Sequence, residues 1–104
     1  MGEGRRLVAW TSSARDSLDE ILSFIASDSP EAASKVLDVV LAAAESLSLF
    51  AERGRVVPET DTSTIREIFV YRYRLLYQVF AAEVRILAVL QGAMDFEGWL
   101  QRGG

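Results

Sequence analysis

The chain has 104 residues, half of them hydrophobic and a quarter charged, with a formal net charge of −4. We expect residues 1–104 to form a single globular domain with one modest core. The sequence contains no cysteine and no histidine, which excludes disulfides and removes the commonest metal ligand and the usual acid/base group at neutral pH. We therefore predict no metal site and no cofactor, and the acidic net charge argues against direct DNA binding.

The charges are distributed unevenly along the chain, and no segment has the character of a membrane span or an export signal. No apolar run approaches the length of a transmembrane helix, and residues 1–6 are too polar for a signal peptide, so we expect a cytoplasmic protein without membrane contact. Residues 1–50 carry eight acidic and four basic residues, whereas residues 62–90 carry four arginines and two glutamates. The arginines that form this local basic surface are Arg66, Arg72, Arg74 and Arg85.

Two helices are predicted in the N-terminal half, after a short apolar strand at residues 7–10. Polar residues just after this strand offer N-caps, and the apolar spacing i, i+4, i+7 predicts a first helix over about 13–26. Ser29 can cap a second helix with Pro30 at its first position, and that helix is expected to end near Phe50. Because the link is short, the helices must form a hairpin. The side chains expected to be buried beneath it include Leu18, Ile21, Val40 and Leu41.

Three strands are predicted in the C-terminal half, after an irregular connection at residues 54–64. Residues 65–70, 73–80 and 84–90 are strand-like and are separated by links of hairpin length, which predicts an antiparallel meander. The order is then β-α-α-β-β-β, an α+β fold in which a helical hairpin packs on a small antiparallel sheet. After Asp95, one helical turn is expected through Phe96, Trp99 and Leu100.

Alternation along two of these strands predicts which side chains share a face of the sheet. Tyr73 and Tyr77 share a face with Leu75 and Val79, so core packing is favoured over a role as general acid. The same rule places together, in the last strand, Val84, Ile86, Ala88 and Leu90.

Six segments, in order and at compatible spacing, resemble the landmarks of the ParE/RelE toxin superfamily. Each segment alone is a weak signal, but together they cover about residues 7–95 and identify both the fold and the family by resemblance. The six segments are 8–14 (VAWTSSA), 29–33 (SPEAA), 54–59 (GRVVPE), 65–68 (IREI), 73–77 (YRLLY) and 84–95 (VRILAVLQGAMD).

The resemblance implies the toxin half of a type II toxin–antitoxin pair, a class associated with plasmid stabilisation, whose partner is a ParD-like or related antitoxin. One branch cleaves messenger RNA on the ribosome with basic and acid/base side chains near the end of the sheet. Gln91 stands where many relatives have histidine, and Met94 where they have arginine. The resemblance therefore favours the ParE-like branch, which inhibits DNA gyrase without catalysis. The alternatives are a RelE-like ribosome-dependent mRNA endonuclease and a toxin-fold protein that only binds its antitoxin.

The arginines of the strand region are the candidate functional side chains. We assign no catalytic residue, but in a nuclease Arg66 and Arg85 are the candidates for holding the phosphate and stabilising developing charge. The alternative for Arg66 is anchoring the connection at 56–64, and for Arg74 and Arg85 it is a solvated or partner-facing position. A further alternative is pairing with nearby acids, which are Glu59, Glu67 and Glu83.

A partner-binding surface is predicted on the sheet face that the helices leave uncovered. Apolar side chains there would form an exposed patch, which usually marks a partner site on a small domain. The resemblance implies that an antitoxin segment folds onto it, as a helix in a groove or as a strand along an edge. The alternative is that a C-terminal turn with Phe96 and Trp99 covers the patch. The predicted partner-binding residues are Phe69, Arg74, Leu76, Phe80 and Leu87.

Overall fold

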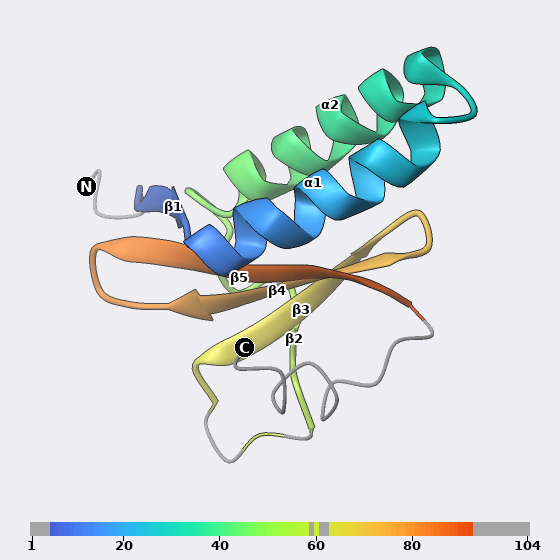
Figure 1. The fold of residues 1–104 in the computed structure, drawn as a ribbon. Coiled ribbons are helices and arrows are strands. Elements are labelled where there is room, and N and C mark those ends of the chain that lie inside the picture. The colour runs from blue at the N-terminus through green and yellow to red at the C-terminus, as the bar shows by residue number, and fades with distance from the viewer. Residues whose placement is uncertain (1–4, 59, 61–62, 93–104) are drawn as a thin grey trace.

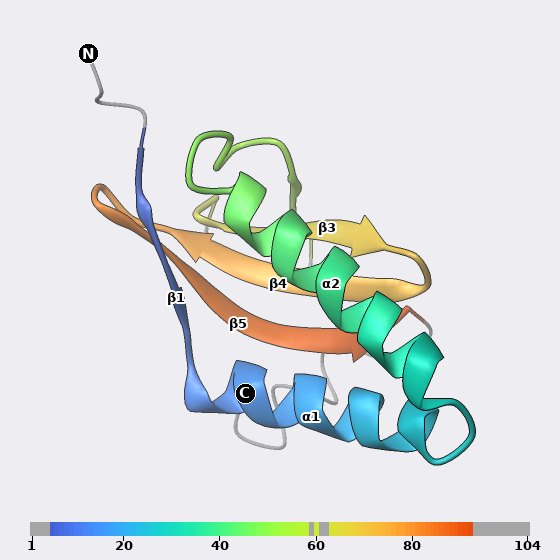
Figure 2. The same cartoon turned by 90° about the horizontal axis from the view of Figure 1, so that it is seen from above.

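The computed structural model describes residues 5–58, 60 and 63–92 and shows two layers, with a helical hairpin laid across one face of a five-stranded sheet (Figures 1 and 2). The predicted α+β fold is confirmed, and its β-α-α-β-β-β order holds with one short strand added. No helix among the described residues is long and apolar enough to cross a membrane. The elements are β1 (Leu7–Trp10), α1 (Ser12–Ala26), α2 (Pro30–Ser46), β2 (Arg55–Val56), β3 (Ile65–Val70), β4 (Tyr73–Val79) and β5 (Glu83–Gln91).

The strands lie in the order β1-β5-β4-β3-β2. The three predicted C-terminal strands form the antiparallel meander, and β1 joins its edge in parallel, with Leu7 opposite Glu83 and Trp10 opposite Ile86. The connection predicted to be irregular at 54–64 contains β2, whose two residues pair antiparallel with β3. The helical turn predicted after Asp95 lies outside the described residues.

Local capping sets the bounds of both helices. Thr11 Oγ1 accepts a hydrogen bond from the Ala14 N–H at 3.0 Å, so α1 begins one residue earlier than predicted. Ser29 caps α2 as predicted, and Pro30 occupies its first turn. The second helix ends at Ser46, before the predicted residue 50, because the following N–H groups bond three residues back and tighten the turn.

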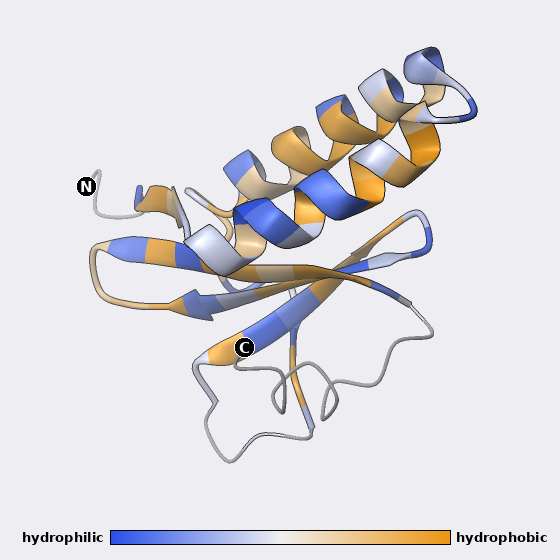
Figure 3. Cartoon of the chain, viewed as in Figure 1, coloured by the Kyte–Doolittle hydropathy of each residue, from blue (hydrophilic) through white to orange (hydrophobic). Residues whose placement is uncertain are grey.

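The main core lies between the helices and the sheet. Figure 3 shows hydrophobic residues spaced along both helices, and the apolar stripe of each one faces the sheet. The predicted core positions of Tyr73 and Tyr77 are confirmed. Leu41 is wrongly predicted, because 44% of its surface is exposed whereas Val40 has none. Successive helical residues are about 100° apart, so Val40 faces the sheet and Leu41 points off the side of the helix.

A β-bulge changes which residues of β5 face the helices. Tyr77 pairs with Ile86, but Leu76 pairs with Ala88, so Leu87 is the extra residue in β5. The alternation predicted for this strand is therefore wrong beyond Ile86. The side chain of Val89 lies in the main core, which was the position expected for Ala88 and Leu90. Those two side chains lie on the other face of the sheet.

Candidate functional site on the outer sheet face

The candidate site lies on the sheet face opposite the helices, called here the outer sheet face. At its centre, the carboxylate of Glu67 in β3 accepts hydrogen bonds from Arg74 Nε at 2.8 Å and Arg74 Nη2 at 2.5 Å. The second carboxylate oxygen accepts one from Arg55 Nε in β2 at 2.5 Å. One carboxylate is thus shared by two guanidinium groups, and the cluster carries a net charge of +1.

Burial of this cluster is graded from its centre to its rim. The side chain of Glu67 is fully buried, and that of Arg74 is 9% exposed, whereas that of Arg55 is 64% exposed. A buried carboxylate is costly unless it is paired and hydrogen-bonded, which explains why two arginines converge on it. The prediction that Arg74 is solvated is therefore wrong, and its pairing with Glu67 is the alternative that holds. A contact of Arg74 with a partner stays a prediction.

A second apolar cluster flanks the ion cluster on the outer sheet face. Leu76 is fully buried there, so the prediction of an exposed apolar side chain at this position is wrong. Leu87, the bulge residue, is partly buried against the same cluster. Of the predicted partner-binding residues, Phe69 and Phe80 are exposed, at 57% and 36%. The buried members of the cluster are Val57, Leu76, Ala88 and Leu90.

Arg66 anchors the segment that follows α2. Its Nη1 donates to the Gly54 carbonyl at 2.7 Å and to the Glu52 carbonyl at 3.4 Å. The predicted anchoring role thus holds, although the anchored segment is 52–54 rather than 56–64. Tyr77 holds the same segment, because its hydroxyl accepts from the Gly54 N–H at 2.9 Å and donates to the Ala51 carbonyl at 2.8 Å.

The two hydrogen bonds between the Tyr77 hydroxyl and the backbone of segment 51–54 form a buried contact, called here the clasp. Burial raises the pKa of Tyr77 above its ordinary value of 10.0, against smaller opposing effects of the Gly54 hydrogen bond and of Arg66 and Arg53. A Cβ at Gly54 would lie 2.5 Å from the Tyr77 hydroxyl and 2.5 Å from the Glu67 carbonyl oxygen, so this position requires glycine. Both hydrogen-bonding roles of the hydroxyl are in use, and the group serves the fold.

Arg85 lies on the other face of the sheet from Arg66. Cross-strand partners share a face, and Arg66 pairs with the core residue Tyr77, whereas Arg85 pairs with the outward Gln78. Arg85 Nε donates to Glu83 at 2.8 Å, and its guanidinium lies 4.6 Å from the centroid of the Phe80 ring. The sheet therefore separates the two candidate phosphate-holding arginines, and they cannot form one site.

Arg55 and the central role of Glu67 are the features that sequence reasoning missed. A local signal existed, because Glu67 is an acid in the middle of an apolar strand, and hairpin pairing places Arg74 diagonally across from it. Arg55 had no such signal, since its strand has only two residues. Among the described residues, no group of three acidic, histidine or cysteine side chains could hold a metal ion.

Comparison with known proteins agrees with this architecture. The model of the family described as the ParE toxin of the type II toxin–antitoxin system parDE matches residues 8–96. No curated protein matches the sequence. A solved structure of the chromosomal ParDE system of P. aeruginosa has 21% identity and a TM-score of 0.69, covering 85% of this chain and 97% of that one.

A second solved structure shows the same fold. The toxin–antitoxin complex RelBE2 of Mycobacterium tuberculosis has 22% identity and a TM-score of 0.58, covering 84% of this chain and 98% of that one. Because the family model spans most of the sequence, the chain belongs to the ParE toxin family of type II toxin–antitoxin systems. The predicted resemblance is confirmed.

Proposed function

We propose that this ParE-family toxin inhibits DNA gyrase by binding to it, without catalysis, and that a cognate antitoxin neutralises it in the cytoplasm. The observation that carries the proposal is the separation of Arg66 and Arg85 by the sheet. Ribosome-dependent cleavage needs a general base, a general acid and cations gathered around one phosphate. The two arginines meant to supply the cations face opposite directions, which disfavours that chemistry.

The remaining groups of the strand region are also committed to structure. The Tyr77 hydroxyl is buried and bonded to Ala51 and Gly54, and Glu67 is enclosed by two guanidinium groups. The sequence contains no histidine. Inhibition by binding requires only a complementary surface, and the exposed Phe69, Phe80 and Arg55 give the outer sheet face both apolar and basic character.

The proposal of an antitoxin partner is supported by both similar structures, which are a ParDE system and a RelBE2 toxin–antitoxin complex. Large exposed apolar side chains on a domain of this size are consistent with a permanent partner. We propose that Phe69 and Phe80 belong to the partner-binding surface, with Leu87 partly exposed between buried neighbours.

The test begins with expression of the chain without antitoxin. Transcript integrity is then measured in the same cells, and DNA supercoiling is measured with purified gyrase and purified toxin. Supercoiling of plasmid DNA by purified gyrase should be inhibited, while primer extension shows intact transcripts. A Gly54→Val variant, which cannot fit between Tyr77 and Glu67, is the inactive control. Ribosome-dependent cuts with unaffected supercoiling would replace the proposal by the nuclease alternative. An inert chain that still binds its antitoxin would indicate a toxin fold without toxicity.

A further inference from the structure

A groove lies at the end of α2, beside the start of β1. Figure 2 shows the chain that follows α2 passing close to the first residues of β1. The groove is open to solvent and has a volume of about 390 Å³ between the N-terminal segment and the chain that follows the helix. The Arg6 N–H donates to the Ser48 carbonyl at 2.7 Å, which holds the two walls together. The lining residues are Arg6, Leu49, Phe50, Ala51, Glu52 and Arg53.

The apolar part of the groove faces solvent. Phe50 is 62% exposed and Leu49 is 48% exposed, although both lie within four residues of the fully buried Leu47. The turn that ends α2 directs these two side chains outward. Adjacent large apolar side chains in a concave surface are typical of a site that a partner covers.

The two arginines of the groove differ from those of the outer sheet face. Arg6 Nε donates to the Phe80 carbonyl at 2.8 Å, and Arg53 Nη1 donates to the Ser46 hydroxyl at 2.8 Å. These acceptors are neutral, so they orient the guanidinium groups without compensating their charge. Within the described residues, neither Arg6 nor Arg53 lies in a salt bridge, whereas Arg55, Arg74 and Arg85 all do.

The backbone of one wall of the groove is held in place before any ligand binds. Tyr77 and Arg66 bind the backbone of segment 51–54 from the core side, as described above. With Arg6, Arg53 and Glu52, the lining carries a net charge of +1. A preorganised site of this kind loses little conformational entropy when a ligand binds, and its free N–H groups suit carboxylates.

We propose that this groove binds a segment of the cognate antitoxin in which a large apolar side chain is flanked by carboxylates. The apolar side chain packs on Leu49 and Phe50, and the carboxylates pair with Arg6 and Arg53. Charge complementarity is the argument for this occupant, since an uncharged or basic segment would leave both guanidinium groups unpaired beneath it. The inference rests on the proposed antitoxin partner and specifies where on the toxin part of that partner binds.

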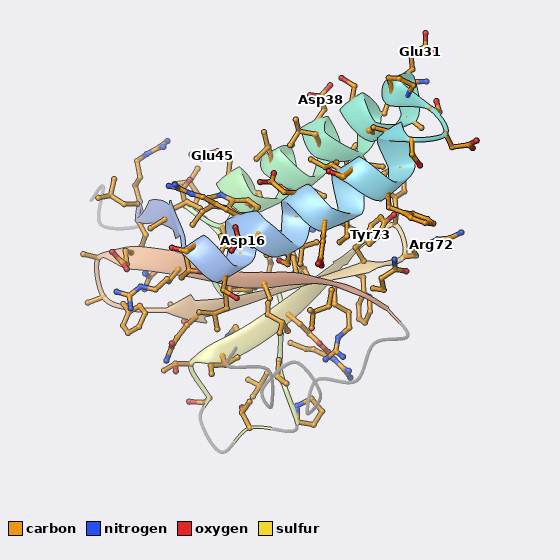
Figure 4. All side chains as sticks on the ribbon, viewed as in Figure 1. Asp16, Glu31, Asp38, Glu45, Arg72 and Tyr73 are labelled. Carbon is orange, nitrogen blue, oxygen red and sulfur yellow. The ribbon has the colours of Figure 1, made fainter. Side chains whose placement is uncertain are left out.

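The test measures the affinity of the full-length cognate antitoxin for purified toxin variants. Phe50→Ser and Arg53→Glu should each weaken binding by about tenfold or more. Phe24→Ser and Arg72→Glu are the matched controls, since both residues are exposed and Arg72 lies at the far end of the sheet (Figure 4). The controls should remain within about threefold of the unmodified toxin, and all four variants should keep its melting temperature.

A charge exchange distinguishes direct contact from misfolding. Arg53→Glu should recover affinity for an antitoxin whose facing carboxylate residue is changed to arginine. Equal affinity of Phe50→Ser, Arg53→Glu and the unmodified toxin would overturn the inference while leaving the antitoxin partnership intact. No binding of the unmodified toxin at all would instead reject the proposed partnership.

A second copy of the chain is the competing occupant. The exposed face of α2 has the same chemistry as the proposed occupant, a large apolar side chain flanked by carboxylates. Leu41 is the exposed apolar side chain, and Asp38 and Glu45, which Figure 4 shows on the helical layer, lie on either side of it in sequence. Light scattering of the free toxin decides this point. A monomer is the expected result, and a dimer that Phe50→Ser dissociates would overturn the assignment to the antitoxin.

Discussion

Arg74 donates two hydrogen bonds, from Nε and Nη2, to a single carboxylate oxygen of Glu67, whose side chain is fully buried. Arg55 supplies the only other cation on this carboxylate among the described residues, and it does so from a largely exposed position. The stability of the outer sheet face therefore depends much more on one arginine than on the other.

Replacement of Arg74 tests this asymmetry. Arg74→Ala leaves a buried carboxylate with one exposed partner and should lower the free energy of unfolding by about 3 kcal/mol. Arg55→Ala, the matched control, removes an exposed cation and should cost less than about 1 kcal/mol. Urea unfolding monitored by circular dichroism measures both. Similar unfolding midpoints for the two variants would show that burial does not determine how much each arginine contributes to stability.

Removal of the Tyr77 hydroxyl tests the clasp on segment 51–54. In Tyr77→Phe, the Gly54 N–H and the Ala51 carbonyl lose their partner in a buried position, which should cost about 1–3 kcal/mol. Tyr71→Phe removes the same atom from an exposed side chain and should change the unfolding midpoint little. If both variants unfold at the same urea concentration, the clasp contributes nothing measurable.

The raised pKa of Tyr77 predicts a loss of stability in alkali. Above pH 10.0, the unfolded chain begins to release the Tyr77 proton while the folded chain still holds it. The unfolded state then binds fewer protons than the folded state, so stability is fully present below pH 10.0 and falls as the pH rises through the folded pKa. Thermal melts from pH 8 to 11 should show a smaller decline for Tyr77→Phe than for the unmodified chain. Parallel declines would contradict the assignment.

Two leucines, Leu41 in α2 and Leu47 at its C-cap, should differ in how much stability their truncation costs. Leu47 is fully buried, so Leu47→Ala should cost about 2–5 kcal/mol. Leu41 points off the side of α2, and Leu41→Ala should cost less than about 1 kcal/mol. Both variants carry the same substitution and are compared by urea unfolding. A larger loss of stability at Leu41 than at Leu47 would mean that the core lies against the face of α2 that carries Leu41.

Antitoxin should raise the thermal stability of the toxin, and the gain should grow with the logarithm of the antitoxin concentration once that concentration exceeds the dissociation constant. A ligand that binds only the folded chain adds about 2.7 kcal/mol at 100 times its dissociation constant. Calorimetry at increasing antitoxin concentration measures the rise. Phe50→Ser should need a higher antitoxin concentration for the same increase, and an unchanged melting temperature throughout would argue against any such partner.

The sequence by itself determined the elements and the family. Helix periodicity, the Ser29 cap, Pro30 and the two hairpin links are local signals, because each depends on neighbours within a few residues. These signals placed both helices and the three C-terminal strands correctly to within a few residues. The six ordered segments identified the toxin family for the same reason, since they reflect the order of these elements.

Only the tertiary structure decided which arginines are used in contacts within the fold and which are available to a partner. Arg66, Arg74 and Arg85 look alike in the sequence, yet one anchors a backbone segment, one is buried on Glu67 and one lies over Phe80. Their roles depend on strand register, on a bulge at Leu87 and on contacts between residues distant along the chain. The groove at Arg53 likewise depends on the path of the chain after α2, where no periodic pattern operates. Pairing across strands is set by the whole sheet, so no local rule could assign it.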